Sequence, residues 1–172
     1  MVPALSRRIA SVTRSAVSAR YRHRGGILAV STVPARLPPA LADRAVAATR
    51  AIAQRLDYVG VLCVEFFLLG DGSLVVNEMA PRVHNSGHWT LDACAVSQFE
   101  QHIRAIMGLP LGDTSLMAPA TVMVNILGER NGDTEVKGLS DALAIPGVHV
   151  HLYGKSPTKV DRKMGHLTAT AD

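Results

Sequence analysis

The hydrophobic and polar positions of the chain follow a helical period in some segments and a strand period in others. An apolar stripe runs from Leu41 to Leu56 at spacings of three and four, which predicts a helix. Apolar or alternating runs predict strands at residues 25–32, 59–69, 73–80, 121–128, 147–154 and 164–171. Helices are also predicted at residues 91–107 and 139–144. The mixture indicates an α+β protein with a subdomain break near residues 108–119.

Composition narrows the class of protein. The chain has 172 residues, of which 48% are hydrophobic and 19% charged, as in a globular protein rather than a disordered one. The uncharged run at residues 59–64 is interrupted by Glu65, well short of the roughly 20 residues of a membrane helix. Cys63 and Cys94 form neither a disulfide framework nor a zinc motif, so we expect a reducing, cytoplasmic setting.

Basic charge is concentrated near the N-terminus. Residues 1–42 contain seven arginines and no acid, whereas the remainder has 11 basic and 14 acidic residues. Three interpretations stay open for this segment: a transit peptide, a nucleic-acid-binding arm, or a stretch that is not the native start of the domain. The segment carries no nucleic-acid-binding motif, so nucleic acid is not the expected partner.

Two acidic residues in the predicted hairpin are the first candidates for chemistry. A two-residue Asp71-Gly72 turn would place Glu65 directly opposite Glu78. Facing carboxylates in apolar strands repel each other, so a positive group should lie between them. A Mg²⁺ ion fits, because it favours one or two carboxylates together with phosphate oxygens. The alternative is that each carboxylate pairs with an arginine or points to solvent.

Polar residues follow the hairpin at once, in the run PRVHNSGH of residues 81–88. The guanidinium of Arg82 suits phosphate or carboxylate oxygens, and a histidine can exchange a proton near neutral pH. His84 and His88 have the spacing of a helical metal pair, but the intervening Asn-Ser-Gly favours a loop. A second basic cluster lies near the C-terminus. It is either a solvated turn or a phosphate clamp, and it contains Lys155, Lys159, Arg162 and Lys163.

Long stretches of the chain resemble one family. The segments ILAVSTVPA, YVGVLCVEFF, VVNEMAPRVHNSGHWTLDACAVSQFEQHIRAIMGLPLG, HLYGK and RKMGH are similar to the C-terminal half of 5-(carboxyamino)imidazole ribonucleotide synthases. These are ATP-grasp carbon–nitrogen ligases of purine biosynthesis. The resemblance implies a basic non-family segment at residues 1–22, part of an ATP-grasp domain at 23–112 and a small β-rich C-terminal domain at 113–172.

The resemblance also implies a reaction and a site. ATP would phosphorylate bicarbonate to carboxyphosphate, and the amine of aminoimidazole ribonucleotide would take the carboxyl group. Arg82 and His84 would be catalytic and would bind substrate with Asn85 and Ser86. The resemblance assigns Mg²⁺ to Glu65 and Glu78, the nucleotide to His23, Asn77 and Glu78, and the ribose phosphate to Lys155, Arg162 and Lys163. Strict alternation turns Asn77 away from Glu78, so its role would require a β-bulge.

Departures from the family set further expectations. Family members are about twice this length and typically form homodimers, and the N-terminal parts that hold adenine and phosphates have no counterpart in the sequence. Residues 1–22 have the bias of out-of-frame translation, so a truncated or frameshifted copy is expected, with weak or no turnover by this chain alone. The alternative is a non-catalytic remnant, or pseudoenzyme, that binds Mg²⁺ and the ribonucleotide. The exposed face left by the missing parts should be an apolar, adhesive patch.

Overall fold

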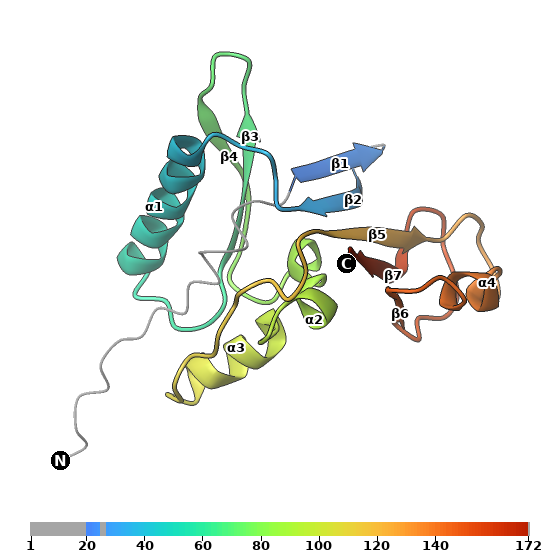
Figure 1. Cartoon of the computed structure of the whole chain (residues 1–172). Helices are drawn as coiled ribbons and strands as arrows, with labels where there is room; N and C mark the ends of the chain where they lie inside the picture. The colour runs from blue at the N-terminus through green and yellow to red at the C-terminus, as the bar shows by residue number, and fades with distance from the viewer. Residues whose placement is uncertain (1–19, 25–26, 172) are drawn as a thin grey trace. The chain divides into compact units, whose positions relative to one another are not determined.

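The computed structural model describes residues 20–24 and 27–171, which belong to two compact units (Figure 1). The first unit comprises residues 36–117. The second combines the strands before residue 36 with residues 118–171. The sequence-based division at residue 112 differs from this one, because it assigned the strand near residues 27–33 to the first domain.

The first unit is built from helices around a two-stranded hairpin. Its elements are α1 (Pro39–Arg55), β3 (Cys63–Leu68), β4 (Leu74–Ala80), the 3₁₀ turn η2 (Asn85–Gly87), α2 (Thr90–Ala93) and α3 (Gln98–Ile106). Proline occupies the first position of α1, where its missing N–H costs nothing. Of the predicted stripe, Leu41 is buried but Leu56 is 54% exposed; Ala53, which lies outside the stripe, is the other buried residue of α1, and α1 packs against β3.

The predicted helix at residues 91–107 is wrong in one respect, because the chain leaves the helical conformation in its middle. Cys94 is extended and forms an isolated antiparallel bridge with Leu116, which lies near the C-terminal end of this unit. The backbone N–H of Met117 donates to the carbonyl of Ala93 at 2.9 Å. A new helix then starts at Gln98, where the Ser97 side chain accepts from the backbone N–H of Glu100. Tertiary pairing therefore overrides helix propensity between α2 and α3.

The β3–β4 hairpin pairs Glu65 with Glu78, as the sequence predicts. The predicted two-residue turn is wrong, however. The N–H of Leu69 donates to the carbonyl of Ser73 at 2.9 Å, which leaves a three-residue loop in which Gly72 adopts a φ of +80°. A β-bulge between Glu65 and the next pair shifts the register back by one residue. The two deviations cancel and restore the carboxylate pairing.

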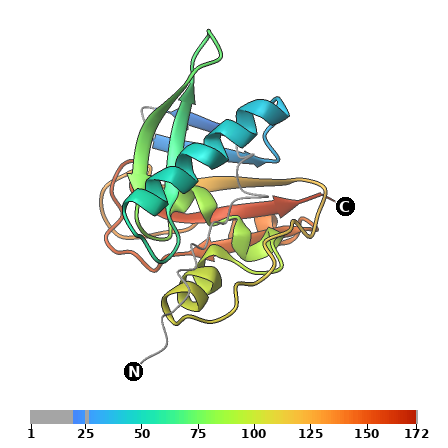
Figure 2. The same cartoon turned by 90° about the vertical axis from the view of Figure 1, so that its left-hand side faces the viewer.

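The loop end of the hairpin exposes a row of apolar side chains. Figures 1 and 2 show this end extending past α1. We call the row the hairpin patch; it consists of Phe67, Leu68, Leu69, Val75 and Val76, each 45–51% exposed. An isolated two-stranded ribbon with such a surface is marginally stable on its own.

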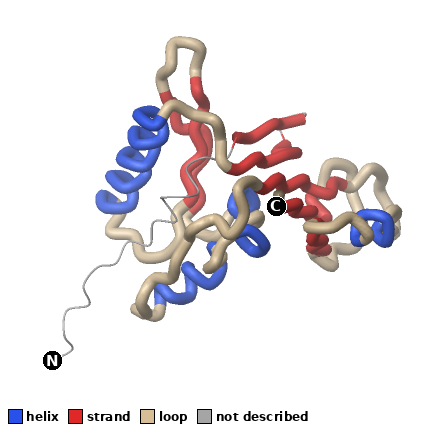
Figure 3. Tube along the Cα trace, in the orientation of Figure 1, coloured by secondary structure: helices blue, strands red, loops and turns tan. Residues whose placement is uncertain are grey.

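The second unit is a five-stranded antiparallel sheet, drawn as red strands in Figure 3. Its order is β1-β2-β5-β7-β6, and its strands are β1 (Arg20–Arg24), β2 (Ile27–Val33), β5 (Thr121–Leu127), β6 (Val148–Leu152) and β7 (Lys163–Thr170). The short helix α4 (Leu139–Leu143) packs beside β6. The predicted strands are thus present, and β1 is an additional one that the sequence pattern did not indicate.

Polar side chains occupy part of the buried surface of this sheet. Asn125 on β5 is 6% exposed, and its amide donates to the carbonyl of Leu28 on β2 at 2.8 Å, which ties the two strands together. His166 and Thr168 on β7 are also buried.

Within the described residues, no helix combines the length and the apolar character that crossing a membrane requires.

Candidate functional site

Two carboxylates and an imidazole meet at the bulged end of the hairpin. Nδ1 of His84 lies 3.5 Å from Oε1 of Glu65, and Nε2 lies 3.5 Å from Oε1 of Glu78. The ring is therefore placed between the carboxylates, where sequence reasoning expected a positive group. The side chain of Glu65 is 7% exposed and that of Glu78 is 51% exposed, so the site has a buried side and an open side.

The bulge brings Asn77 to the same site. Asn77 is the extra residue of β4, since Glu65 pairs with Glu78 and the next residue of β3 pairs with Val76. Its Nδ2 lies 3.5 Å from Oε2 of Glu65. This is the bulge that the sequence analysis required for a role of Asn77, and it gives three oxygen-bearing side chains a common location.

His84 is held by a glutamine that sequence reasoning missed. The backbone N–H of His84 donates to Oε1 of Gln98 at 3.0 Å, and Nε2 of Gln98 donates to the carbonyl of His84 at 2.8 Å. The same Nε2 lies 2.8 Å from Nδ1 of His88. Gln98 is only 3% exposed, and its own N–H donates to Oγ1 of Thr90. No local sequence pattern predicts these contacts, because His88 and His84 precede Gln98 by 10 and 14 positions.

A thiol and a hydroxyl complete the buried side. Sγ of Cys63 lies 3.6 Å from Nδ1 of His84 and 3.4 Å from Oγ of Ser86, and that hydroxyl lies 2.9 Å from the same Nδ1. Burial raises the pKa of the Cys63 thiol to about 11, with the charges of Glu65 and Glu78 acting in the same direction. The thiol is therefore protonated at neutral pH.

The other loop residues predicted for the site lie around this cluster. Arg82 is exposed, and its Nη1 donates to the carbonyl of Val83 at 3.0 Å. Asn85 begins the 3₁₀ turn and is half-buried. His88 lies in the same loop with its ring centroid 5.2 Å from that of Phe99, and the groups of possible metal ligands among the described residues do not include it.

The basic residues predicted to grip a phosphate lie in the second unit. Nζ of Lys155 donates to the carbonyl of Lys163 at 2.7 Å and lies 5.1 Å from the ring centroid of Tyr153. Nη1 of Arg162 donates to the carbonyl of Pro157 at 2.8 Å. Oη of Tyr153 lies 2.8 Å from Nδ1 of His166, so the ring beneath the lysine is itself held. The side chains of Lys155 and Arg162 are therefore held in place by backbone carbonyls instead of extending freely into solvent.

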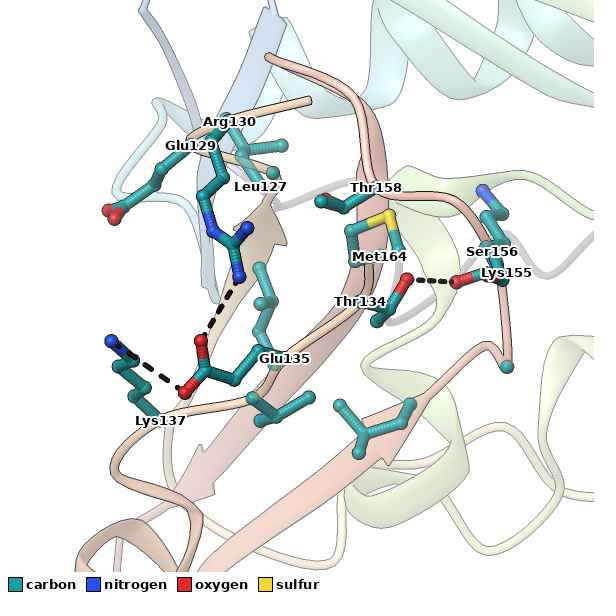
Figure 4. Close-up of a pocket in the computed structure, with 15 residues that line it drawn as sticks. Leu127, Glu129, Arg130, Thr134, Glu135, Lys137, Lys155, Ser156, Thr158 and Met164 are labelled. Atoms are coloured by element: carbon teal, nitrogen blue, oxygen red, sulfur yellow. Dashed lines mark hydrogen bonds and ion pairs between the residues drawn. The ribbon is translucent and has the colours of Figure 1, made fainter. Parts of the chain in front are cut away.

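A cavity of about 660 Å³ lies beside this loop (Figure 4). Its polar rim contains Arg130 and Lys137, which contact Glu135 at 3.0 Å and 3.7 Å. Thr134, which also lines the cavity, donates to the carbonyl of Lys155 at 3.0 Å. The charged side chains of the lining are two acidic and three basic ones, namely Glu129, Glu135, Arg130, Lys137 and Lys155.

The oxygen atoms near the hairpin suit a hard divalent cation. The contacts of Glu65 and Glu78 within the described chain are 3.5 Å long, whereas a tight charge-assisted pair is about 2.7–2.9 Å. Both carboxylates therefore retain capacity for a cation, and the amide oxygen of Asn77 is a further hard donor. His23 belongs to β1, but its side chain lies outside the described residues.

Comparison with known proteins places this geometry in a family. The model of the ATP-grasp domain matches residues 7–99. The chain belongs to the ATP-grasp family. Residues 121–172 match the phosphoribosylaminoimidazole carboxylase C-terminal domain. The ATP-grasp match includes residues 7–22, which the sequence analysis placed outside the resemblance, and β3, β4 and the site loop lie within it.

Similar ATP-grasp proteins carry a consistent name. N5-carboxyaminoimidazole ribonucleotide synthase of Brucella melitensis is 50% identical over 146 residues, which are 85% of this chain and 39% of that protein. The Bacillus subtilis synthase is 49% identical over 147 residues, or 85% of this chain and 37% of that protein. This chain thus spans less than two fifths of the length of these relatives.

Solved ATP-grasp structures agree with the computed fold. The synthetase of Thermus thermophilus has a TM-score of 0.79 at 45% identity and covers 90% of this chain and 41% of its own. The Aspergillus clavatus enzyme, solved with ADP and aminoimidazole ribonucleotide, has a TM-score of 0.82 at 38% identity over 89% of this chain and 42% of its own.

Proposed function

We propose that this chain takes part in ATP-dependent carboxylation of 5-aminoimidazole ribonucleotide with bicarbonate, by way of carboxyphosphate, as a carbon–nitrogen ligase of purine biosynthesis. The observation that carries the proposal is the pairing of Glu65 with Glu78 around His84 at a bulged hairpin. Support comes from relatives bearing the synthase name and from a similar structure solved with ADP and the ribonucleotide.

Glu65, Glu78 and Asn77 would hold Mg²⁺ at the open side of the site. When bound, this ion neutralises charge on the ATP phosphates during phosphoryl transfer. Glu65 is the fixed member, because it is buried and contacts both Asn77 and His84. Glu78 is half-exposed and so is free to adjust to a nucleotide. His23 is assigned to the nucleotide by resemblance alone.

His84 and the residues of its loop would bind the bicarbonate-derived carboxyl group and orient the substrate amine toward it. The Gln98 clamp fixes the backbone of His84, and the two carboxylates fix the plane of its ring, so its proton is held at a defined place. Arg82, on the exposed side of the loop, would bind the oxygens of the bicarbonate-derived group. Asn85 and Ser86 would contact the imidazole of the substrate.

Lys155, Arg162 and Lys163 would bind the ribose phosphate. Hydrogen bonds to backbone carbonyls hold the first two side chains in place, which lowers the entropy lost when an anion binds. Bicarbonate and aminoimidazole ribonucleotide are the proposed substrates. A homodimer of the longer protein and a cytoplasmic setting are proposed with them.

The test is an assay of ADP release from ATP by the purified chain in the presence of Mg²⁺, ¹⁸O-labelled bicarbonate and aminoimidazole ribonucleotide, with the inorganic phosphate analysed by mass spectrometry. We expect slow release that requires all three components and transfers ¹⁸O from bicarbonate to inorganic phosphate. Glu65→Gln should abolish it, whereas Lys137→Ala, on the rim of the cavity, should not.

ADP release that ignores bicarbonate or the ribonucleotide would contradict the proposal. Saturable ribonucleotide binding without any ADP release would instead identify the chain as a non-catalytic binding module, the second interpretation of the sequence.

A further inference from the structure

The buried side of the hairpin site contains ligands that a hard cation does not use. Cys63, Glu65 and His84 each present one ligand atom, and the three atoms lie within 4.8 Å of one another. Thiolate and imidazole are ligands for borderline and soft metals such as Zn²⁺, whereas Mg²⁺ prefers oxygen alone. The proposed Mg²⁺ site and this second set share only Glu65.

Two of the three distances between ligand atoms match a tetrahedral zinc site. Bonds of about 2.3 Å to sulfur and about 2.05 Å to nitrogen, at the tetrahedral angle, separate the two ligand atoms by about 3.6 Å. Sγ of Cys63 lies 3.6 Å from Nδ1 of His84. Bonds of about 2.1 Å to oxygen and about 2.05 Å to nitrogen separate those atoms by about 3.4 Å. Oε1 of Glu65 lies 3.5 Å from the same Nδ1.

The surroundings of His84 also fit a metal ligand. A zinc-bound histidine usually directs its second ring nitrogen at a carboxylate, a backbone carbonyl or water, which fixes the tautomer. Nε2 of His84 faces Oε1 of Glu78 at 3.5 Å, and the Gln98 clamp fixes the backbone behind the ring. On binding, the metal would replace the Ser86 hydroxyl as the partner of Nδ1.

We propose that Cys63, Glu65 and His84 form a three-ligand site for Zn²⁺, with water or a substrate oxygen in the fourth position. The thiol releases its proton to solvent as the Zn–S bond forms, so each zinc bound liberates one proton from Cys63. Because Glu65 belongs to both donor sets, zinc excludes Mg²⁺ and inhibits turnover. This last consequence rests on the proposed function; zinc binding itself does not.

The test is a titration of the metal-free chain with Co²⁺ alone, followed by absorption spectroscopy. We expect a thiolate-to-cobalt charge-transfer band that saturates at one equivalent and is removed by Zn²⁺. Cys63→Ser should eliminate the band and weaken Zn²⁺ binding by more than about 100-fold, since a direct ligand contributes more than a residue that only hydrogen-bonds to a ligand.

Cys94→Ser is the matched control. Burial raises the pKa of Cys94 to about 11 as well, but Cys94 belongs to neither group of possible metal ligands among the described residues, so the band should persist. A band that survives Cys63→Ser, or its absence from the unaltered chain, overturns the proposal. X-ray absorption of the zinc-loaded chain is decisive even when a variant fails to fold, because it must show one sulfur at about 2.3 Å.

The two proposals fail in distinguishable ways. A cobalt band without ribonucleotide-dependent ADP release would retain the zinc site and reject the ligase function. ADP release that Zn²⁺ inhibits equally in the unaltered chain and in Cys63→Ser would retain the ligase function and reject the zinc site.

Discussion

Replacing Gln98 by methionine tests whether its clamp positions His84. The substitution keeps the length of the side chain but removes the amide that pairs the backbone N–H and carbonyl of His84, at 3.0 and 2.8 Å. Each buried backbone group left unpaired costs about 1–3 kcal/mol, so the loss of both should lower the free energy of unfolding by about 2–6 kcal/mol. Displacement of His84 should also weaken ribonucleotide binding at least about tenfold, which corresponds to about 1.4 kcal/mol.

The chain contains a matched control for this experiment. Gln101, on the same helix and equally 3% exposed, clamps the backbone of Gly112 in the same way, through hydrogen bonds of 2.7 and 2.9 Å. Gln101→Met should therefore cost similar stability without affecting the site. Urea denaturation and calorimetric titration with aminoimidazole ribonucleotide measure the two effects. Equal losses of affinity in both variants, or an unchanged stability in Gln98→Met, would refute the reasoning.

Three further predictions follow from other parts of the chain. Phe67→Ser, which breaks the hairpin patch, should reduce self-association in sedimentation velocity; an unaltered chain that stays monomeric at high concentration would contradict this. Tyr153→Leu, which removes the ring beneath Lys155, should weaken ribonucleotide binding, and it should add nothing in a Lys155→Met background; additive losses would exclude a positioning role. Hydrogen bonds from Ser73 lower the pKa of Asp71 in the folded chain. The ionised carboxylate therefore stabilises the folded state above the unfolded pKa, and this stabilisation is lost as pH falls through the folded pKa. In Asp71→Asn the free energy of unfolding should accordingly fall less steeply as the pH is lowered, and an unchanged pH dependence would contradict this prediction.

The sequence predicted the carboxylate pair more reliably than the hairpin that produces it. Glu65 faces Glu78 because a longer turn and a bulge at Asn77 compensate each other. Neither deviation has a local signature, since turn length and bulge position depend on which backbone hydrogen bonds the whole ribbon forms. The predicted partners are therefore right although the chain does not adopt the predicted turn.

Contacts between distant segments were beyond sequence reasoning. The clamp of Gln98 on His84 and the approach of Cys63 to the same ring join residues 14 and 21 positions apart. The break between α2 and α3 depends on a strand-like return at Leu116. By contrast, period and turn residues were enough to predict α1 and every strand of the second unit except β1, because those signals are local. The roles assigned to the basic loop remain predictions.

Recognition of the ribonucleotide phosphate tests the central claim most directly. The chain would be titrated by calorimetry with aminoimidazole ribonucleotide and, in parallel, with the riboside that lacks the phosphate. We expect saturable binding of the ribonucleotide at one equivalent and binding of the riboside that is at least about tenfold weaker, with a difference that disappears in Lys155→Met. Absence of ribonucleotide binding, or equal binding of the two ligands by the unaltered chain, would contradict it.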